Sequence, residues 1–130
     1  MNNFVYDTAV LIAADRNDRR TWAEHKARLE MGYLPLVPAA VVAQASRSPK
    51  QAQLRRFLTG CAVVALRETD AHEAGKLLGL TNTADVVDAS VVVVAARNKA
   101  LILTADPKDL ARLARASGGD IPVVPICRPQ

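Results

Sequence analysis

The sequence predicts an α/β fold in which a mainly parallel sheet is covered by helices on both faces. Short apolar runs of strand length alternate with longer stretches that carry helix-capping residues. The apolar runs are nearly continuous, which is typical of strands that are buried on both faces. The 130 residues contain no internal repeat or low-complexity segment, so we expect a single domain spanning residues 1–130.

The first half of the chain alternates extended and helical segments. The expected elements are a strand at 3–6, a helix at 21–31, an extended segment at 34–38, a helix at 38–47, a helix at 50–58 and a strand at 61–66. Thr21 fits an N-cap because Glu24, three residues later, completes a capping box. Pro38 and Pro49 suit the beginnings of helices, and Gly60 suits an end.

The second half continues the alternation. The expected elements are a helix at 70–78 ended by Gly79, a helix at 83–97, a strand at 101–103, a helix at 108–116 and a strand at 121–126. Asp70 and Thr83 are the expected N-caps of the two longer helices. Four valines at 91–94 favour a strand, but the surrounding alanines and the Thr83 cap favour a helix. Pro122 and Pro125 indicate that the last strand lies at a sheet edge.

Charge and cysteine content limit the functional classes. The formal charge of +4 and the isoelectric point of about 9.4 favour anionic partners such as nucleic acid. Cys61 and Cys127 have no metal-binding spacing, so we expect free thiols in a reducing compartment. The N-terminus lacks the basic region of a secretion signal, and the longest apolar run is too short to span a bilayer. These features predict a cytoplasmic protein without membrane association.

Four aspartates lie at the edges of apolar runs: Asp7, Asp85, Asp88 and Asp106. Asp7 and Asp106 follow expected strands, so both should lie on the rim where parallel sheets bind ligands. Asp85 and Asp88 lie three residues apart and should share one face of their helix. Since an unpaired carboxylate beside a core is costly, the set is better explained by a shared cation than by coincidence.

Each of these aspartates also has a possible structural role. Asp106 precedes a proline and fits a helix N-cap. Asp85 fits the first turn of a helix, where the dipole favours an acid. Asp7 fits an Asx-turn after a strand. Asp88 is the hardest to explain in this way, because its helix is apolar and no Lys or Arg lies within one turn.

The composition of the acidic set indicates which metal it would bind. Oxygen ligands without a His or Cys cluster favour Mg²⁺, with Mn²⁺ as the alternative. His25 and His72 are not in a metal-spaced pair, so both are expected on helix surfaces. Carboxylates around one or two such ions suit the hydrolysis of phosphodiester bonds. A haloacid-dehalogenase-like phosphatase is unlikely, because it needs a second aspartate at position 9, which is Ala9.

The sequence resembles the PIN-domain nucleases, specifically the VapC-like toxins of bacterial toxin–antitoxin pairs. The resemblance covers nearly the whole chain and rests on residues 5–11 (VYDTAVL), 88–90 (DAS) and 103–106 (LTAD), with Asp109 following. It implies a three-layer Rossmann-like fold, Mg²⁺-dependent cleavage of RNA, a homodimer and neutralisation by a small cognate antitoxin. It also implies site roles for particular residues. Metal binding falls on Asp7, Asp88 and Asp106, a supporting hydroxyl on Thr104 and a less central acid on Asp109.

One position departs from the family pattern. A glutamate usually follows on the helix after the Pro38 segment, and here that position is Gln44. Glutamine can accept a hydrogen bond but brings no charge. Either the metal is held more weakly or Asp85 supplies the missing charge, and we favour compensation by Asp85. A binding module that has lost turnover is the alternative function.

The remaining functional candidates are basic and aromatic. Seven basic residues follow the first strand or belong to the middle helices: Arg16, Arg19, Arg20, Arg47, Lys50, Arg55 and Arg56. They would attract a phosphate backbone if their segments flank the acidic rim, or they are solvated helix faces. Phe4 and Tyr6 are expected in the core. Trp22 and Tyr33 fit either the core or an antitoxin-binding surface.

Overall fold

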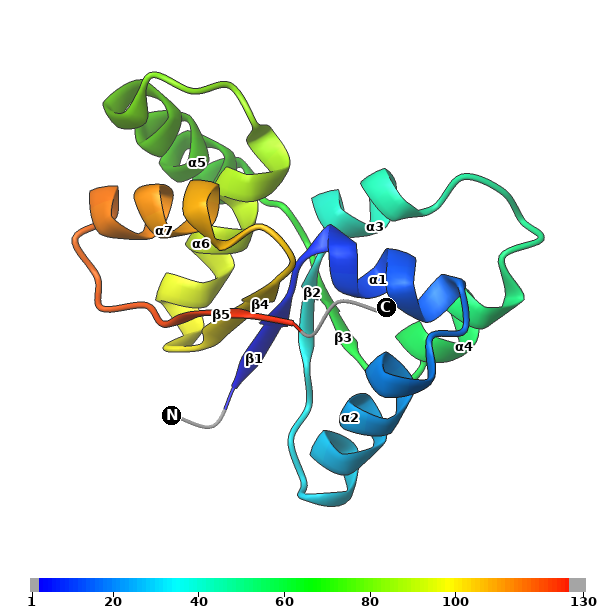
Figure 1. Ribbon diagram of the computed structural model, residues 1–130. Helices are drawn as coiled ribbons and strands as arrows, with labels where there is room; N and C mark the ends of the chain where they lie inside the picture. The colour runs from blue at the N-terminus through cyan, green and yellow to red at the C-terminus, as the bar shows by residue number, and fades with distance from the viewer. Residues whose placement is uncertain (1–2, 127–130) are drawn as a thin grey trace.

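The central feature of the fold is a five-stranded parallel sheet with the order β3-β2-β1-β4-β5 (Figure 1). The computed structural model describes residues 3–126. The strands are β1 (Phe4–Tyr6), β2 (Leu36–Pro38), β3 (Ala62–Val64), β4 (Leu101–Thr104) and β5 (Val123–Pro125). The predicted α/β fold with a parallel sheet is therefore confirmed, and β5 lies at an edge as its two prolines indicated.

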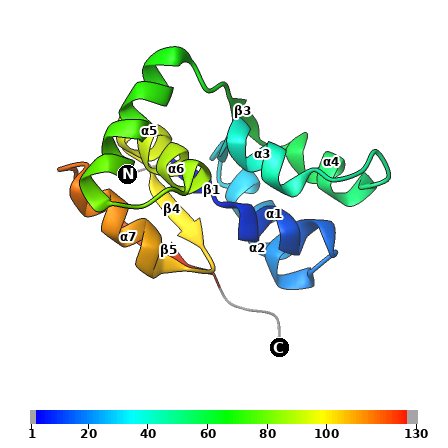
Figure 2. The ribbon, with the colours of Figure 1, turned by 90° about the horizontal axis from the view of Figure 1, so that it is seen from above.

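Seven helices within residues 3–126 surround the sheet. They are α1 (Thr8–Asp15), α2 (Arg19–Glu30), α3 (Ala39–Ala45), α4 (Ala52–Leu58), α5 (Glu68–Thr81), α6 (Val86–Asn98) and α7 (Pro107–Ala116). Helices α1 to α4 lie on one side of the sheet and α5 to α7 on the other, as Figures 1 and 2 both show. The three layers follow from this arrangement, because β1 and β4 are covered from both sides, by α1 and by α6.

The strand order reverses between β1 and β4. Chain connections from β1 lead outward through β2 to β3, whereas those from β4 lead to β5 on the other side. The two strands pair in parallel, with Phe4 opposite Leu101 and Tyr6 opposite Leu103. Ligands of open parallel sheets bind beyond the carboxyl ends of the strands at such a reversal. The residues that directly follow β1 and β4 therefore occupy the expected ligand-binding position.

The core contains helix α6 and the apolar strands. Val91 to Val94 are helical and buried, so the helical interpretation of the valine run is confirmed. The central strand contributes Val5 and Tyr6, both fully buried, and α4 contributes the fully buried ring of Phe57. Phe4 is half-buried against this core. A helix that is apolar on all sides suits this position, because α6 contacts β1, β2 and β4 as well as α5 and α7.

Several element boundaries differ from the prediction. Helix α1 was not predicted, and it begins directly after Asp7. The N-cap of α2 is Asp18, whose carboxylate accepts a hydrogen bond from the amide of Thr21, so Thr21 is not the cap. No single helix within residues 3–126 is long and apolar enough to cross a membrane. Helices α5 and α6 pass such a test only as a pair, which is bent by 114°.

The start of α5 and the junction between α5 and α6 also differ. Asp70 is not the N-cap of α5 but its third residue, where its carboxylate accepts a hydrogen bond from the amide of Arg67. The helix continues past Gly79 to Thr81 and ends at Asn82, whose φ of 53° is left-handed. The N-cap of α6 is Asp85.

Candidate functional site

The carboxylate of Asp7 is fixed at the carboxyl end of β1 by two hydrogen bonds. Its Oδ1 accepts from the amide of Thr8 at 2.7 Å, which caps the start of α1. Its Oδ2 accepts from Oγ1 of Thr104, the last residue of β4, at 2.7 Å. The side chain is buried, with 8% of its surface exposed. Asp7 therefore combines a capping role with a place at the rim of the sheet.

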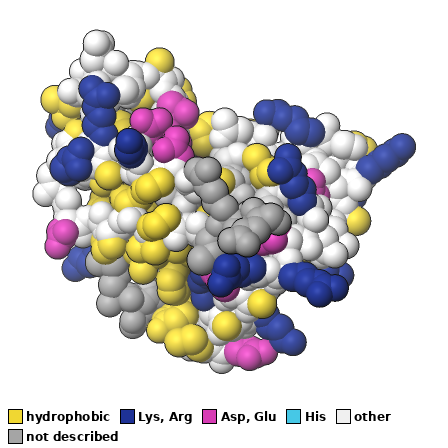
Figure 3. Space-filling model, in the orientation of Figure 1, with side chains coloured by type: hydrophobic (Ala, Val, Ile, Leu, Met, Phe, Trp, Pro, Cys, Tyr) yellow, Lys and Arg dark blue, Asp and Glu magenta, His cyan; other side chains and the backbone are white. Residues whose placement is uncertain are grey.

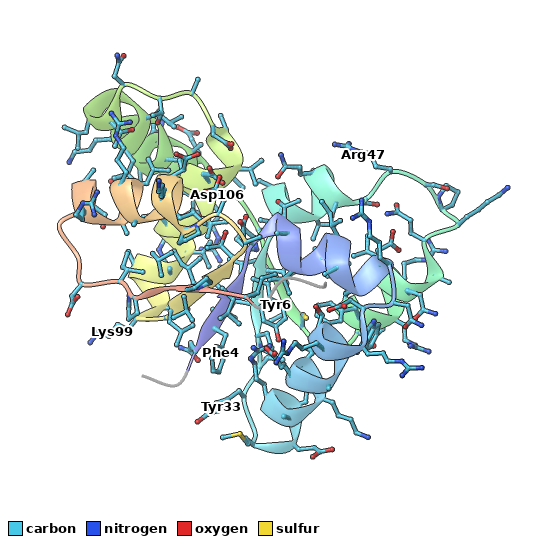
Figure 4. All side chains as sticks on the ribbon, viewed as in Figure 1. Phe4, Tyr6, Tyr33, Arg47, Lys99 and Asp106 are labelled. Atoms are coloured by element: carbon cyan, nitrogen blue, oxygen red, sulfur yellow. The ribbon has the colours of Figure 1, made fainter. Side chains whose placement is uncertain are left out.

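Asp106 lies two residues beyond β4 on the same rim. Its amide donates to Oγ1 of Thr104 at 3.0 Å, so one hydroxyl connects the backbone of Asp106 to the carboxylate of Asp7. Asp106 occupies the N-cap position of α7, but its side chain makes no capping hydrogen bond. Figure 4 places it at the end of the sheet where the strands finish. Its exposed carboxylate is therefore free of the structural role that its sequence position suggested.

The start of α6 supplies two more acids. Asp85 is the N-cap, and its Oδ1 accepts from the amide of Asp88 at 3.0 Å. Asp88 lies in the first turn and is half-buried, and Asp85 is exposed. The predicted place of Asp85 inside the first turn is therefore wrong, because it precedes that turn as the cap. Its proximity to Asp88 agrees with the expectation that the two share one region.

Electrostatic coupling shows that these acids lie close together. Burial raises the pKa of Asp7, against the hydrogen bonds from Thr104 and Thr8, and the charges of Asp85 and Asp106 raise it further. Burial also raises the pKa of Asp88, to about 7, with added repulsion from Asp85, Asp7 and Asp109. Within residues 3–126 none of these five carboxylates forms an ion pair with Lys or Arg. Three distant segments thus bring their carboxylates near enough to repel one another.

The acids are gathered but do not yet surround a common point. Among the described residues, no three Asp, Glu, His or Cys side chains stand in positions that could hold a metal ion. Both oxygens of Asp7 are engaged by protein donors, and mutual repulsion favours separation of the remaining carboxylates. The chemical type of the donors, oxygen throughout, suits a hard divalent cation. A shared ion would require rotation of side chains such as that of the exposed Asp106.

Gln44 lies beside this cluster. Its Oε1 accepts a hydrogen bond of 2.5 Å from Oγ1 of Thr8, the residue after Asp7. Gln44 is exposed on the last turn of α3, whereas Thr8 is buried at the first position of α1. The chain of hydrogen bonds therefore runs from Gln44 through Thr8 and Asp7 to Thr104. The sequence had placed Gln44 near the site only through the family pattern, and the link to Thr8 was not expected.

The acidic rim is open. Figure 3 shows Asp and Glu side chains gathered beside the notch at the top of the view, in the area where Figure 4 labels Asp106. A cavity of about 770 Å³ lies elsewhere, between α5, α6 and α7, and none of the site aspartates lines it. Small ligands are usually enclosed in pockets, whereas a polymer needs access along a surface. The open rim is the arrangement that suits a polymer.

Positive charge exceeds negative charge in the half of the molecule that contains α1 to α4, although Lys and Arg side chains are also present on the other half. The seven basic residues singled out in the sequence are all exposed. Figure 3 shows Lys and Arg side chains on the right-hand part of the molecule, where Figure 1 has α1, α2 and α4. Arg47, labelled in Figure 4, extends from the loop after α3. The half that contains α1 to α4 thus lies next to the acidic rim, on the other side of the notch from Asp106.

The histidine prediction was half wrong. His72 is exposed on α5 as expected, but His25 is buried on α2, with 3% of its surface exposed. Its Nδ1 is 2.8 Å from the hydroxyl of Tyr6, and its ring lies 4.0 Å from that of Phe57. Burial lowers the pKa of His25 to about 4, so the ring is neutral. The partner Tyr6 is 19 residues distant, and no local pattern indicates such a contact.

The aromatic residues left open by the sequence are half-buried. The indole of Trp22 packs against the core, and its N–H donates to the carbonyl of Ala14 at 2.9 Å. The ring of Tyr33 meets that of Phe4 edge to face at 5.2 Å. Cys61 is a free thiol, as predicted, and burial raises its pKa to about 12. Cys127 lies outside the described residues.

Comparison with known proteins identifies the fold. No protein-family model and no curated protein sequence matches the chain. A solved structure of VapBC2 from Rickettsia felis, bound to a DNA fragment from their promoter, has a TM-score of 0.73. The match has 15% identity and covers 96% of this chain and 99% of that one.

Two further solved structures have a similar fold. A toxin–antitoxin complex from Klebsiella pneumoniae has a TM-score of 0.62 at 18% identity, over 82% of this chain and 89% of that one. FitAcB from Neisseria gonorrhoeae has a TM-score of 0.61 at 13% identity, and the match covers 93% of this chain and 96% of that one. This is a PIN-like fold. At such low identities the likeness concerns the fold, and the PIN-like fold agrees with the three-layer Rossmann-like architecture that the resemblance implied.

Proposed function

We propose that this protein is a Mg²⁺-dependent endoribonuclease of the toxin–antitoxin type. The observation that carries the proposal is the convergence of Asp7, Asp88 and Asp106 at the strand-order reversal, without a Lys or Arg partner among the described residues. Carboxylates that repel one another and lack basic partners are stabilised by a bound cation. The structural neighbours, which come from toxin–antitoxin complexes, support the same class.

The proposed ligands are Asp7, Asp88 and Asp106, with Asp85 assisting and Asp109 adding negative charge. Thr104 would orient Asp7 through the hydrogen bond that it donates. When bound, Mg²⁺ or Mn²⁺ would lower the pKa of an attacking water and neutralise charge on the phosphate. Asp88 would lose the proton that it holds below about pH 7, and the side chain of Asp106 would rotate inward. The proposed carboxylates therefore act as ligands only after a local rearrangement.

The distribution of charge supports an RNA substrate. Residues 16–60 contain nine Lys and Arg and only three Asp and Glu. The positive charge of the chain, +4 in total, therefore comes from this part of the sequence. A phosphate backbone would lie against this basic half and bring one phosphodiester bond to the acidic rim. The low aromatic content, 4%, agrees with recognition by shape and backbone contact more than by base stacking.

We also propose the partners that the resemblance implied. The neighbours named as complexes contain an antitoxin, so a small cognate antitoxin is the expected inhibitor of this protein. A homodimer and a cytoplasmic location belong to the same proposal. Size-exclusion chromatography with light scattering would test the dimer.

RNA cleavage with matched variants tests the nuclease activity. Wild-type protein should cleave RNA in Mg²⁺ and not in EDTA, and Asp7→Asn should reduce the rate by roughly 100-fold or more. Asp120→Asn is the control, because Asp120 is exposed and precedes β5, whereas the site lies at the carboxyl ends of the parallel strands. Undiminished cleavage by the Asp7 variant would reject this site.

A binding module without turnover is the second candidate. It is favoured by the neutral side chain of Gln44 and by the absence, among residues 3–126, of a group of side chains ready to hold a metal. Such a protein would bind Mg²⁺ in a calorimetric titration but would not cleave RNA. A large gain of activity in Gln44→Glu would support this candidate, whereas cleavage by the wild-type protein would exclude it.

A further inference from the structure

The hydroxyl of Thr8 holds the carboxamide of Gln44 in one orientation. Thr8 is buried at the first position of α1, so its Oγ1, which donates to Oε1 of Gln44, is held in a fixed position. With Oε1 engaged, the Nε2 end of the amide is directed away from Thr8. The reverse orientation would expose the partly negative carbonyl oxygen next to a cluster of carboxylates, which is electrostatically unfavourable.

The Nε2 group of Gln44 has two N–H donors and no hydrogen-bond acceptor among the described residues. It lies at the exposed end of α3, beside a rim where the charged groups that act on Asp7 are the carboxylates of Asp85 and Asp106. A phosphate that approaches such a rim meets repulsion from every carboxylate. The amide is a neutral donor, so it can bind a phosphate oxygen without adding to that repulsion.

We propose that Gln44 contacts the substrate, donating from Nε2 to a non-bridging phosphate oxygen of the RNA strand next to the cleaved bond. This rests on the proposed nuclease function and gives Gln44 a role different from that of a metal ligand. The carbonyl oxygen of Gln44 is neutral and already accepts from Thr8, which makes it a weaker ligand for the cation than the carboxylates are. The positive charge of Arg47, three residues later and exposed, assists at the same end of α3.

Variants at both ends of the Thr8–Gln44 contact test the proposal. Binding of a short fluorescein-labelled single-stranded RNA is measured by fluorescence anisotropy in EDTA, and kcat and KM are measured in Mg²⁺. Gln44→Ala should raise both the Kd and the KM by roughly 10-fold, the value expected for a lost hydrogen bond to a charged group, with a smaller change in kcat. Gln44→Glu should weaken RNA binding further, because it adds a negative charge.

Substitutions of Thr8 test whether RNA binding depends on the orientation of the Gln44 carboxamide and not only on its presence. Thr8→Val removes the hydroxyl at nearly constant volume and should resemble Gln44→Ala, whereas Thr8→Ser keeps the hydroxyl and should resemble the wild type. The double variant Thr8→Val with Gln44→Ala should be no weaker than either single variant, because both remove the same contact. The Mg²⁺ concentration at half-maximal thermal stabilisation should not change in Gln44→Ala.

Two results would overturn the assignment of Gln44 while leaving the nuclease function intact. One is unchanged RNA binding in Gln44→Ala, and the other is a shift of its Mg²⁺ midpoint with RNA binding unaffected, which would make Gln44 a metal ligand. If wild-type protein neither binds nor cleaves RNA, the proposed function itself is wrong and the role of Gln44 falls with it.

Discussion

The hydroxyl of Thr104 donates to the carboxylate of Asp7 from 97 residues away in the sequence. The same oxygen accepts the amide of Asp106, so a single buried side chain connects the ends of the neighbouring strands β1 and β4. This contact positions the acid nearest to the centre of the sheet and links it to the acid that follows β4.

Removal of the Thr104 hydroxyl should destabilise the protein. In Thr104→Val one oxygen of Asp7 and the amide of Asp106 lose their partner, which should lower the free energy of unfolding by about 1–3 kcal/mol. The pKa of Asp7 should rise further, because the hydrogen bond from Thr104 lowers it. Urea denaturation measures the stability. Thr104→Ser retains the hydroxyl, and equal losses in both variants would show that packing of the methyl group dominates.

Neutralisation of Asp88 should stabilise the metal-free protein at high pH. Asp88 titrates near 3.8 when unfolded and near 7 when folded, so between these values the folded state binds more protons. Its contribution to stability therefore decreases as the pH rises through this range. Asp88→Asn should melt at a higher temperature than the wild type at pH 8, and the difference should shrink towards pH 5. Asp120→Asn should show no such trend.

Mg²⁺ should stabilise the folded protein. A cation that binds only the folded state at about 10 times its Kd adds about 1.4 kcal/mol, which corresponds to a rise in Tm of roughly 4 °C for a domain of this size. The rise should be larger at pH 8 than at pH 5.5, because protonation of Asp88 competes with the metal. Thermal melts of wild type and Asp7→Asn provide the comparison. Equal Tm values with and without millimolar Mg²⁺ would contradict the proposed centre.

His25 should make the free energy of unfolding depend on pH in the direction opposite to that of Asp88. It titrates near 4 when folded and near 6.5 when unfolded, so the unfolded state binds more protons within that range and stability is lost as the pH falls. His25→Gln should be less stable at neutral pH and should lose less stability between pH 6.5 and 4 than the wild type does. Acid denaturation tests this. The exposed His72→Gln should follow the wild-type curve.

Much of the fold was predictable because strands and helix caps leave local signals. The predicted strand ends placed Asp7 and Asp106 on one rim. The alanines that flank the valines of α6 correctly indicated a helix. Helix α1 was missed because its residues 9–14 are all apolar and because Asp7, its N-cap, was interpreted as the end of a strand or as a ligand. One residue can serve as both cap and site, and a linear pattern does not distinguish the roles.

Contacts between distant residues were the part that the sequence could not supply. At the junction between α5 and α6, the sequence indicated Thr83 as the N-cap and Asp85 as a residue of the first turn. In the structure the Thr83 hydroxyl pairs with that of Thr81 at 2.7 Å, which leaves Asp85 to cap α6. The burial of His25 depends on Tyr6 and Phe57, and the orientation of Gln44 depends on Thr8. Such pairings become visible only when the chain is folded.

The central place of β1 has a consequence for synthesis of the protein. Strand β1 lies between two neighbours, and one of them, β4, is synthesised only after β2, β3 and the helices α1 to α6. A nascent polypeptide that ends before Thr104 cannot bring its early and late aspartates together. Translation must therefore have passed Asp106 before any chemistry that depends on this meeting of acids can begin.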